Sequence, residues 1–195
     1  NTNLEDGSVL AAGIEFNLAG QANFGGGATN VVFILDATGS TNDINGLDAN
    51  GDGALDENDD INQDGSVGDI LDVEISAIQH LSELLIASSA DVQVAVVPFG
   101  ASARSPLDLG PDAHSQLIQD PSLHKANTTS EPDMDTALRA ITALGGGSFH
   151  DGINMANDVL VGAPDADQIL VFFFTDGAEA PPSPELMEAF ASHGL

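Results

Sequence analysis

Val31-Val32-Phe33-Ile34-Leu35, followed by Asp36-Ala37-Thr38-Gly39-Ser40, is the stretch of sequence that indicates the fold. Its first half is a continuous apolar run without polar alternation, which is typical of a strand buried on both faces of a parallel sheet. A second such run, Ile169-Leu170-Val171-Phe172-Phe173-Phe174, is followed by Thr175-Asp176-Gly177. The chain is therefore predicted to contain two buried strands, each followed closely by an aspartate and turn residues.

The rest of the chain alternates strand and helix patterns. We expect one further strand at 92–99 and a short edge strand at 103–107. Apolar residues at helical spacing predict helices at 71–87, 134–144, 153–161 and 184–192. This alternation predicts an α/β fold with a doubly wound, mainly parallel sheet flanked by helices. We assign residues 1–29 to a leader or interdomain segment and 30–195 to the domain, with an acidic insertion at 41–70.

The composition is strongly acidic. There are 31 Asp and Glu residues against 3 Lys and Arg residues, and the formal net charge is −28. This balance argues against a nucleic-acid partner, because phosphate contacts depend on Lys and Arg, and against an anionic membrane surface. No apolar run reaches the ~20 residues of a transmembrane helix, and the lack of cysteine excludes thiolate metal sites. Two explanations of the acidity stay open: a solvated acidic surface, or bound divalent cations that supply positive charge.

The ends of the two apolar strands predict a metal site. Ligands of open α/β sheets bind outside the carboxyl ends of strands, so Asp36 and Asp176 meet there if their strands are neighbours. Two carboxylates that close need a cation between them or raised pKa values. Thr38 and Ser40 add hydroxyl oxygens, and such an all-oxygen set suits Mg²⁺ or Mn²⁺. The alternative is that the two aspartates only cap turns or helices.

Three motifs resemble those of the von Willebrand factor A domain. Asp36-x-Thr38-x-Ser40 resembles the Asp-x-Ser-x-Ser signature of that family. The segment 145–153, Gly-Gly-Gly-Ser-Phe-His-Asp-Gly-Ile, resembles its Gly-Gly-Thr loop and the helix start that follows. The segment 173–177, Phe-Phe-Thr-Asp-Gly, resembles its Thr-Asp-Gly segment. The resemblance covers roughly residues 29–193, with the motifs in the order of the family.

The resemblance implies a metal-ion-dependent adhesion site, in which Mg²⁺ or Mn²⁺ keeps one position for an acidic group of a protein or glycan ligand. Thr38 stands where the family has Ser, and Ser148 stands where the family has Thr, so each position keeps a hydroxyl group. The family fold has one or two further elements after the last predicted helix, so we expect neighbouring parts of a larger chain. By resemblance the site residues are Asp36, Thr38, Ser40, Ser148 and Asp176.

The insertion contains a loop with the spacing of a calcium-binding loop. Residues 48–59, Asp-Ala-Asn-Gly-Asp-Gly-Ala-Leu-Asp-Glu-Asn-Asp, fit the pattern D-x-N-x-D-G with an acid at position twelve. Oxygens at positions one, three and five surround one side of a cation, and the glycine at position six permits the sharp turn. An Asp at position twelve resembles the dockerin variant of this loop. The predicted Ca²⁺ ligands of this first loop are Asp48, Asn50, Asp52, the carbonyl of Ala54, Asp56 and Asp59.

The next residues repeat the design. Asp60-Ile61-Asn62-Gln63-Asp64-Gly65-Ser66 supplies positions one to seven, but position twelve is Leu71. Asp69 or Asp72 must therefore close this second loop. The alternative for both loops is a self-repelling acidic linker without ions. The predicted Ca²⁺ ligands of the second loop are Asp60, Asn62, Asp64 and Ser66, with Asp69 or Asp72.

We expect a binding module and not an enzyme. A phosphotransferase resembling the haloacid dehalogenases would use Asp36 as nucleophile, but it needs a second Asp where Thr38 stands and a positioned Lys, for which only Lys125 is present. A third interpretation is a spacer rigidified by calcium. His150, two residues beyond Ser148, is a candidate for contact with the ligand. The acidity, the missing cysteines and the calcium loops resemble the A domains of large secreted bacterial adhesins of the RTX type, which implies an extracellular, cell-surface location.

Overall fold

The computed structural model describes residues 27–43, 46–88, 91–100, 134–143, 145–163, 165–177 and 183–191. The expected leader lies almost wholly outside these residues. The expected edge strand at 103–107 and Lys125 lie outside them as well. The division into leader and domain therefore stays a prediction.

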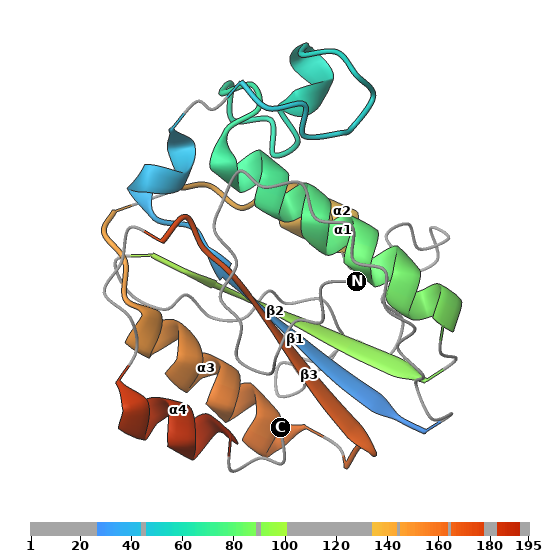
Figure 1. Cartoon of the computed structure of the whole chain (residues 1–195), viewed down its shortest axis with the longest axis vertical. Helices are drawn as coiled ribbons and strands as arrows, with labels where there is room; N and C mark the ends of the chain where they lie inside the picture. Colours follow the sequence, from blue (N-terminus) through green and yellow to red (C-terminus); the bar gives the residue numbers. More distant parts are fainter. Residues whose placement is uncertain are drawn as a thin grey trace, which may run out of the picture.

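Three parallel strands form the described sheet, in the order β2-β1-β3 (Figure 1). They are β1 (Thr29–Asp36), β2 (Val92–Phe99) and β3 (Gln168–Phe174). All eight residues of β1 are buried, because this apolar strand is central and is covered on both faces. The three expected strands and their parallel arrangement are confirmed, and the fold is of the α/β class.

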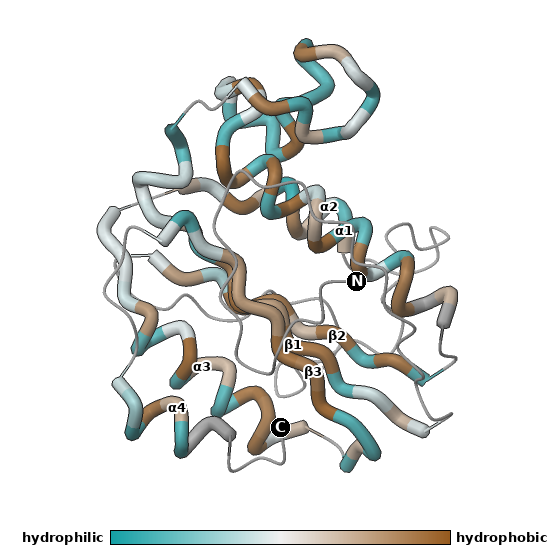
Figure 2. Tube along the Cα trace, in the orientation of Figure 1, coloured by the Kyte–Doolittle hydropathy of each residue, from teal (hydrophilic) through white to brown (hydrophobic). Residues whose placement is uncertain are grey.

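Helices cover both faces of this sheet (Figure 1). The helices α1 (Ile70–Ser88) and α2 (Met134–Arg139) lie on one face, and α3 (Phe149–Gly162) and α4 (Pro184–Ala191) lie on the other. Because side chains alternate along a strand, β1 serves two cores. Phe33 packs into the cluster on the α1 face, and Ile34 into the cluster on the α3 face. Figure 2 accordingly shows the strands as a hydrophobic centre.

Two helices, α2 and α3, differ from their predicted bounds by more than one residue at an end. The predicted helix 134–144 ends at Arg139, and Ile141 is buried in the α1-side cluster without being helical. The helix predicted at 153–161 begins earlier, at Phe149, because Ser148 caps it by accepting from the amide of Asp151. The spacing of apolar residues thus located the buried turns of α3 but not its N-cap at Ser148.

The strand β3 is less buried than predicted. It forms one edge of the described sheet, and its side chains are mostly half-buried, with Phe173 38% exposed. Its aromatic residues still pack on the core, since the ring of Phe172 lies 5.5 Å from that of Phe33 and the ring of Phe173 lies 5.1 Å from that of Phe149.

Among the described helices, none is long and apolar enough to cross a membrane.

The insertion stands at the amino-terminal end of α1, beyond the carboxyl end of β1 (Figure 1). A 3-10 helix, η1 (Gly39–Asn42), follows the Asp36 turn, and a second, η2 (Glu57–Asp59), lies inside the first loop. At Gly68 an added Cβ would collide with the carbonyl of Leu47, and φ is +65°, so glycine is required where the two ends of the insertion meet.

Candidate metal centre

Asp36 lies at the end of the central strand and is fully buried. Its Oδ1 accepts the amide of Thr38 at 3.0 Å, and its Oδ2 accepts the hydroxyl of Thr175 at 3.1 Å. Burial raises the pKa of the Asp36 carboxyl, the bonds from Thr38 and Thr175 lower it, and the nearby carboxylate of Asp176 raises it further. The register of β1 and β3 places the two aspartates at neighbouring strand ends, as predicted.

The hydroxyls of the Asp36 turn lie together. Thr38 Oγ1 is 2.8 Å from Ser40 Oγ, and Thr38 is buried. The turn is held from two sides, because Thr41 donates its hydroxyl to the Thr38 carbonyl at 2.8 Å and Gly39 donates its amide to the Gly145 carbonyl at 2.7 Å. The second contact joins the Asp36 turn to the glycine-rich segment that leads into α3.

Ser148 has a structural role in this conformation. Its Oγ accepts the amide of Asp151 at 3.3 Å and caps α3. The alternative in which Asp36 only caps a turn accounts for its bond from the Thr38 amide, but Asp36 also accepts the hydroxyl of Thr175 from a second turn. His150 is exposed in the first turn of α3. The three predicted segments lie at one end of the sheet. Side-chain hydrogen bonds join Asp36, Thr38, Ser40 and Thr175 there, whereas the glycine-rich segment is joined to the Asp36 turn through the backbone bond from Gly39 to Gly145.

Two residues at this end of the sheet were not predicted. Thr175 precedes Asp176 and bonds Asp36, and its Oγ1 also accepts the amide of Gly177 at 3.0 Å. Glu74, on α1, is 7% exposed, and its Oε2 has no hydrogen-bond partner in the part of the chain that the structure describes. The sequence did contain a signal for Glu74, because positions 71, 74, 75 and 78 share one face of a helix that is otherwise apolar.

Burial raises the pKa of Glu74 well above its ordinary value, and the carboxylates of Asp36, Asp176 and Asp69 raise it further. Within the described ranges, no three His, Cys, Asp or Glu side chains converge closely enough to form a metal site by themselves. The oxygen atoms available to a cation at the end of β1 are therefore of two kinds. Carboxylates come from Asp36, Asp176 and Glu74, and hydroxyls come from the turns that follow β1 and β3.

The first loop is folded around its own side chains. Asp48 Oδ1 accepts the amides of Gly51 and Asp52 at 2.7 and 3.0 Å, and its Oδ2 accepts that of Gly53 at 2.6 Å. Asp59, at position twelve, is fully buried and accepts the amide of Asn50 at 3.1 Å. The loop is thereby closed from position twelve back to position three.

Asp56 and Asp59 form a capping box around η2. The Asp56 amide donates to Asp59 Oδ2 at 2.9 Å, and Asp56 accepts the amide of Asn58 at 2.8 Å. Hydrogen bonds from Asp56 and Asn50 lower the pKa of Asp59, which keeps this carboxylate charged.

The second loop repeats this geometry. Asp60 accepts the amides of Asp64 and Gly65, both at 3.0 Å, as Asp48 does in the first loop. Both loops have a positive φ at positions four and six. These residues are Gly51 (75°) and Gly53 (89°) in the first loop, and Gln63 (59°) and Gly65 (97°) in the second.

Asp72 closes the second loop in the way that Asp59 closes the first. Asp72 Oδ1 accepts the amides of Ile61 and Asn62 at 2.7 and 3.2 Å. Asp69 and Asp72 bond each other's amides at 3.2 and 2.9 Å, which matches the reciprocal bonds of Asp56 and Asp59. The second loop is therefore one residue longer, and Asp69 takes the place of Asp56. Burial raises the pKa of Asp69 to about 7 and raises that of Asp72.

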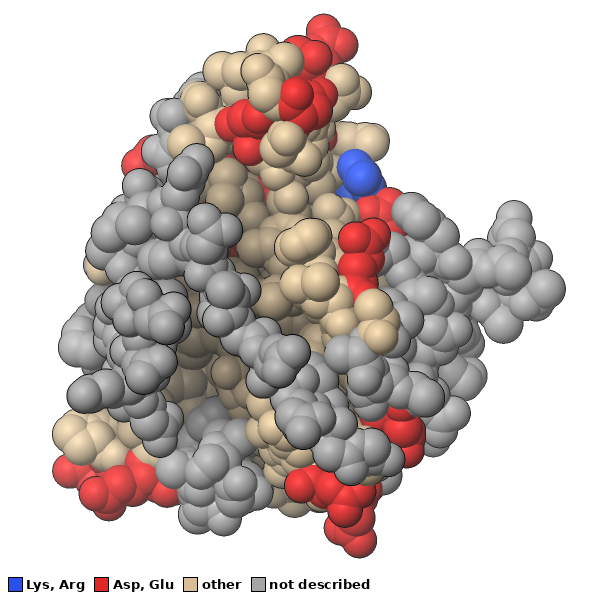
Figure 3. All heavy atoms as spheres, turned by 45° about the vertical axis from the view of Figure 1, so that its right-hand side comes forward, with Lys and Arg blue, Asp and Glu red and all other residues tan. Residues whose placement is uncertain are grey.

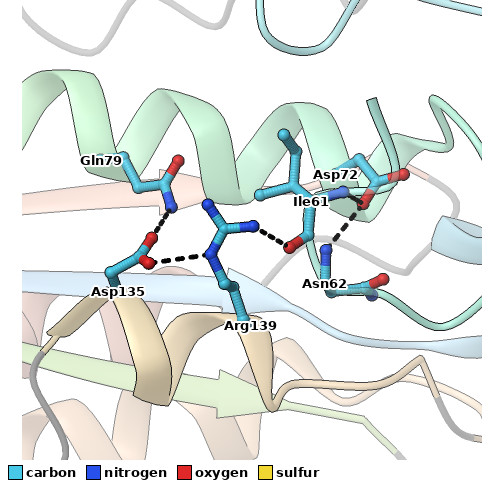
Figure 4. A network of polar contacts seen from close by, with 6 residues as sticks. All are labelled: Ile61, Asn62, Asp72, Gln79, Asp135 and Arg139. Atoms are coloured by element: carbon cyan, nitrogen blue, oxygen red, sulfur yellow. Dashed lines mark hydrogen bonds and ion pairs between the residues drawn. The ribbon is translucent and has the colours of Figure 1, made fainter. Parts of the chain in front are cut away.

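A polar network fixes the second loop on α1 and α2 (Figure 4). Arg139 donates to the carbonyl of Ile61 at 2.8 Å and to Asp135 Oδ2 at 2.9 Å. Gln79 donates to the other oxygen of Asp135 at 2.6 Å. Arg139 is the only Lys or Arg among the described residues, and this network pairs it with Asp135 and the Ile61 carbonyl.

Asn42 connects the second loop to the Asp36 turn. With its amide nitrogen turned toward them, the side chain donates to Asp64 Oδ2 at 3.3 Å, to Asp69 Oδ2 at 3.1 Å and to Ser66 Oγ at 3.2 Å. Asn42 ends η1, two residues after Ser40. Figure 3 shows acidic side chains over the insertion at the top and others along the lower edge of the molecule, with the one described cationic side chain in blue below the insertion. The insertion thus lies beside the predicted adhesion site, as expected.

Comparison of the chain with protein-family models, with curated proteins and with solved structures yields no match.

Proposed function

We propose that this chain is a cation-dependent binding module of the von Willebrand factor A type, with its adhesion site at the carboxyl ends of β1 and β3. The observation that carries the proposal is the environment of Asp36. This fully buried carboxylate accepts donors from its own turn and from Thr175, and a second carboxylate, Asp176, acts on it. The only described Arg is bonded to Asp135 and to the Ile61 carbonyl. A bound dication would therefore compensate the negative charges of Asp36 and Asp176.

The hydroxyl geometry fits such an ion. Neighbouring ligands of an octahedral ion with bonds of about 2.0–2.1 Å lie about 2.9 Å apart. Thr38 Oγ1 and Ser40 Oγ are 2.8 Å apart, so both can bind one ion without rearrangement of the turn. The residues that would hold Mg²⁺ or Mn²⁺ are Thr38, Ser40 and Asp36, with Asp176 directly or through water, and Ser148 once its cap bond to Asp151 opens.

The ligand class follows from charge. A bound dication supplies an electron-poor position that a carboxylate of a protein or glycan ligand can fill. With a formal net charge of −28, the chain repels acidic ligands, so recognition of such a ligand depends on the cation. We also propose, from the resemblance to the A domains of bacterial adhesins, that the module acts outside the cell on a bacterial surface and has no catalytic role.

We also propose one Ca²⁺ in each loop of the insertion. Positions one, three and five of both loops carry oxygens on a backbone that already has the required turns, and position twelve or its equivalent closes each loop. Calcium there would hold Asn42, and through it η1, in place next to Ser40. The insertion would then support the adhesion site.

Binding to arrays of acidic peptides and glycans tests the proposal. The array is probed at saturating Ca²⁺, with and without Mn²⁺. We expect binding that requires Mn²⁺ and is lost in Asp36→Asn and Ser40→Ala. Ser76→Ala, which removes a hydroxyl of α1 outside the site, is the matched control and should bind as the parent does. Binding that survives in Asp36→Asn, or that ignores Mn²⁺, contradicts the proposal.

A further inference from the structure

Among the residues that the structure describes, Glu74 is the one buried carboxylate to which the proposed sites give no role. It lies on α1, two residues beyond Asp72, which closes the second loop. Its side chain is 7% exposed, and Oε2 has no hydrogen-bond partner among the described residues. A buried carboxylate oxygen without a donor is costly to the fold, so the place of Glu74 on the apolar face of a helix calls for a physical reason.

The surroundings of Glu74 give that reason. The acidic groups that act on it are Asp36, Asp176 and Asp69, which come from the end of β1, the turn after β3 and the start of α1. The only Lys or Arg in the described ranges, Arg139, bonds Asp135 and Ile61. Like charges gathered from three segments, with no cationic side chain among them, repel each other unless a cation joins them or protons neutralise them.

We propose that Glu74 is the third carboxylate of the cation site at the end of β1. The inference rests on the proposed function and deepens it, since it adds a residue that the family motifs do not include. The three carboxylates do not converge to ligand spacing, so Glu74 is a positioning residue. Its charge attracts the cation from the inner side of the site and orients the water that completes the coordination shell.

The inference also links the two cation regions. Glu74 lies in the first turns of α1, the helix that also contains Asp72, which closes the second loop. A charge on α1 that is held by the cation at Asp36 fixes the amino-terminal end of this helix against the sheet. The adhesion site and the second loop then share one helix as their common support.

Mn²⁺ affinity tests the inference, with one equivalent of Ca²⁺ per loop already bound and free Mn²⁺ followed by electron paramagnetic resonance. Glu74→Gln keeps the size of the side chain and removes its charge. We expect Glu74→Gln and Asp36→Asn each to weaken Mn²⁺ binding about tenfold or more. The double variant should lose less than the two single losses combined, because both carboxylates act on one ion.

Glu83→Gln is the matched control, because Glu83 is exposed on the same helix. It should bind Mn²⁺ as the parent does. If Asp36→Asn binds Mn²⁺ normally, the proposed site itself fails. If Asp36→Asn weakens binding and Glu74→Gln behaves like Glu83→Gln, the site stands and the inference about Glu74 is overturned.

Unfolding in urea gives a readout that a purely structural role would not produce. In chelator, Glu74→Gln should be as stable as the parent or more stable, because a buried amide costs less than a buried charge. In Mn²⁺ the parent should gain more stability than the variant; equal gains overturn the inference. Should Glu74→Gln fail to fold, Glu74→Met offers an apolar side chain of similar length, and parent-like Mn²⁺ affinity in that variant overturns it as well.

Discussion

Thr175 donates its hydroxyl to Asp36 Oδ2 at 3.1 Å, across 139 positions of sequence. The bond joins the turn after β3 to the end of β1 and fixes one oxygen of a fully buried carboxylate. The other oxygen is fixed by the amide of Thr38. The orientation of Asp36 is therefore set by two strands, and this is the arrangement a preorganised cation site requires.

Thr175→Val removes this donor and keeps the shape of the side chain. Because the acceptor is a buried carboxylate, we expect the free energy of unfolding in chelator to fall by about 1.5–3 kcal/mol. Mn²⁺ affinity should also fall, since Asp36 loses its orientation. Urea unfolding and Mn²⁺ titration measure the two effects. Thr175→Ser keeps the hydroxyl and should resemble the parent; equal behaviour of Val and Ser variants would show that the bond has no such role.

The closure of the second loop by Asp72 predicts a difference between two neighbouring carboxylates. Asp72→Asn should weaken one Ca²⁺ site about tenfold or more, because Asp72 holds the position that Asp59 holds in the first loop. Asp69→Asn should weaken it less, as Asp69 corresponds to position nine. Calorimetric titration with Ca²⁺ separates the two variants. A larger loss in Asp69→Asn would reverse the assignment of the closing residue.

The stability of the cation-free protein should depend on pH. Burial raises the pKa of Asp69 to about 7 and also raises those of Asp36, Asp72 and Glu74. A carboxyl whose pKa is higher in the folded chain favours folding while it is protonated. The stability from Asp69 is therefore present below about pH 4 and is lost as the pH rises through about 7, and the other three carboxyls act in the same direction. The melting temperature in chelator should therefore fall across this range. Asp69→Asn should flatten the decline, whereas Asp43→Asn, at an exposed position after η1, should leave it unchanged.

Saturating Ca²⁺ should weaken or reverse this dependence on pH, because a bound cation favours the charged form of the same carboxylates. Identical pH profiles with and without Ca²⁺ would argue that the buried carboxylates do not bind it.

Arg139 should anchor the insertion. Arg139→Gln removes the bonds to the Ile61 carbonyl and to Asp135, of which the second is a partly exposed pair on one helix and contributes little. The unpaired carbonyl dominates, and we expect a loss of about 1–2 kcal/mol in the free energy of unfolding. Arg139→Lys keeps the charge but cannot reach both partners with one planar group, so it should recover only part of the loss. An Arg139→Gln variant as stable as the parent would show that these hydrogen bonds do not stabilise the insertion.

Much of the fold could be predicted from local sequence. The apolar run at β1 and the spacing along α1 gave the elements to within a few residues, because burial imposes a period on each element. The extent of β3 was predicted, but its partial exposure was not, since a strand's place at the edge of a sheet depends on its neighbours. The shorter α2 was also missed, because Ile141 is buried without continuing the helix.

The sequence by itself determined the positions of the two loops and of the Asp36 and Asp176 turns, because their spacing acts over a few residues along the chain. Only the tertiary structure decided that Thr175 bonds Asp36, that Asp72 closes the second loop, and that Asp36 and Asp176 act on Glu74. These contacts depend on which segments the sheet brings side by side, and no local pattern specifies that. Burial then determines the protonation and the binding properties of each carboxylate, because a carboxylate removed from water needs a hydrogen-bond donor, a proton or a cation.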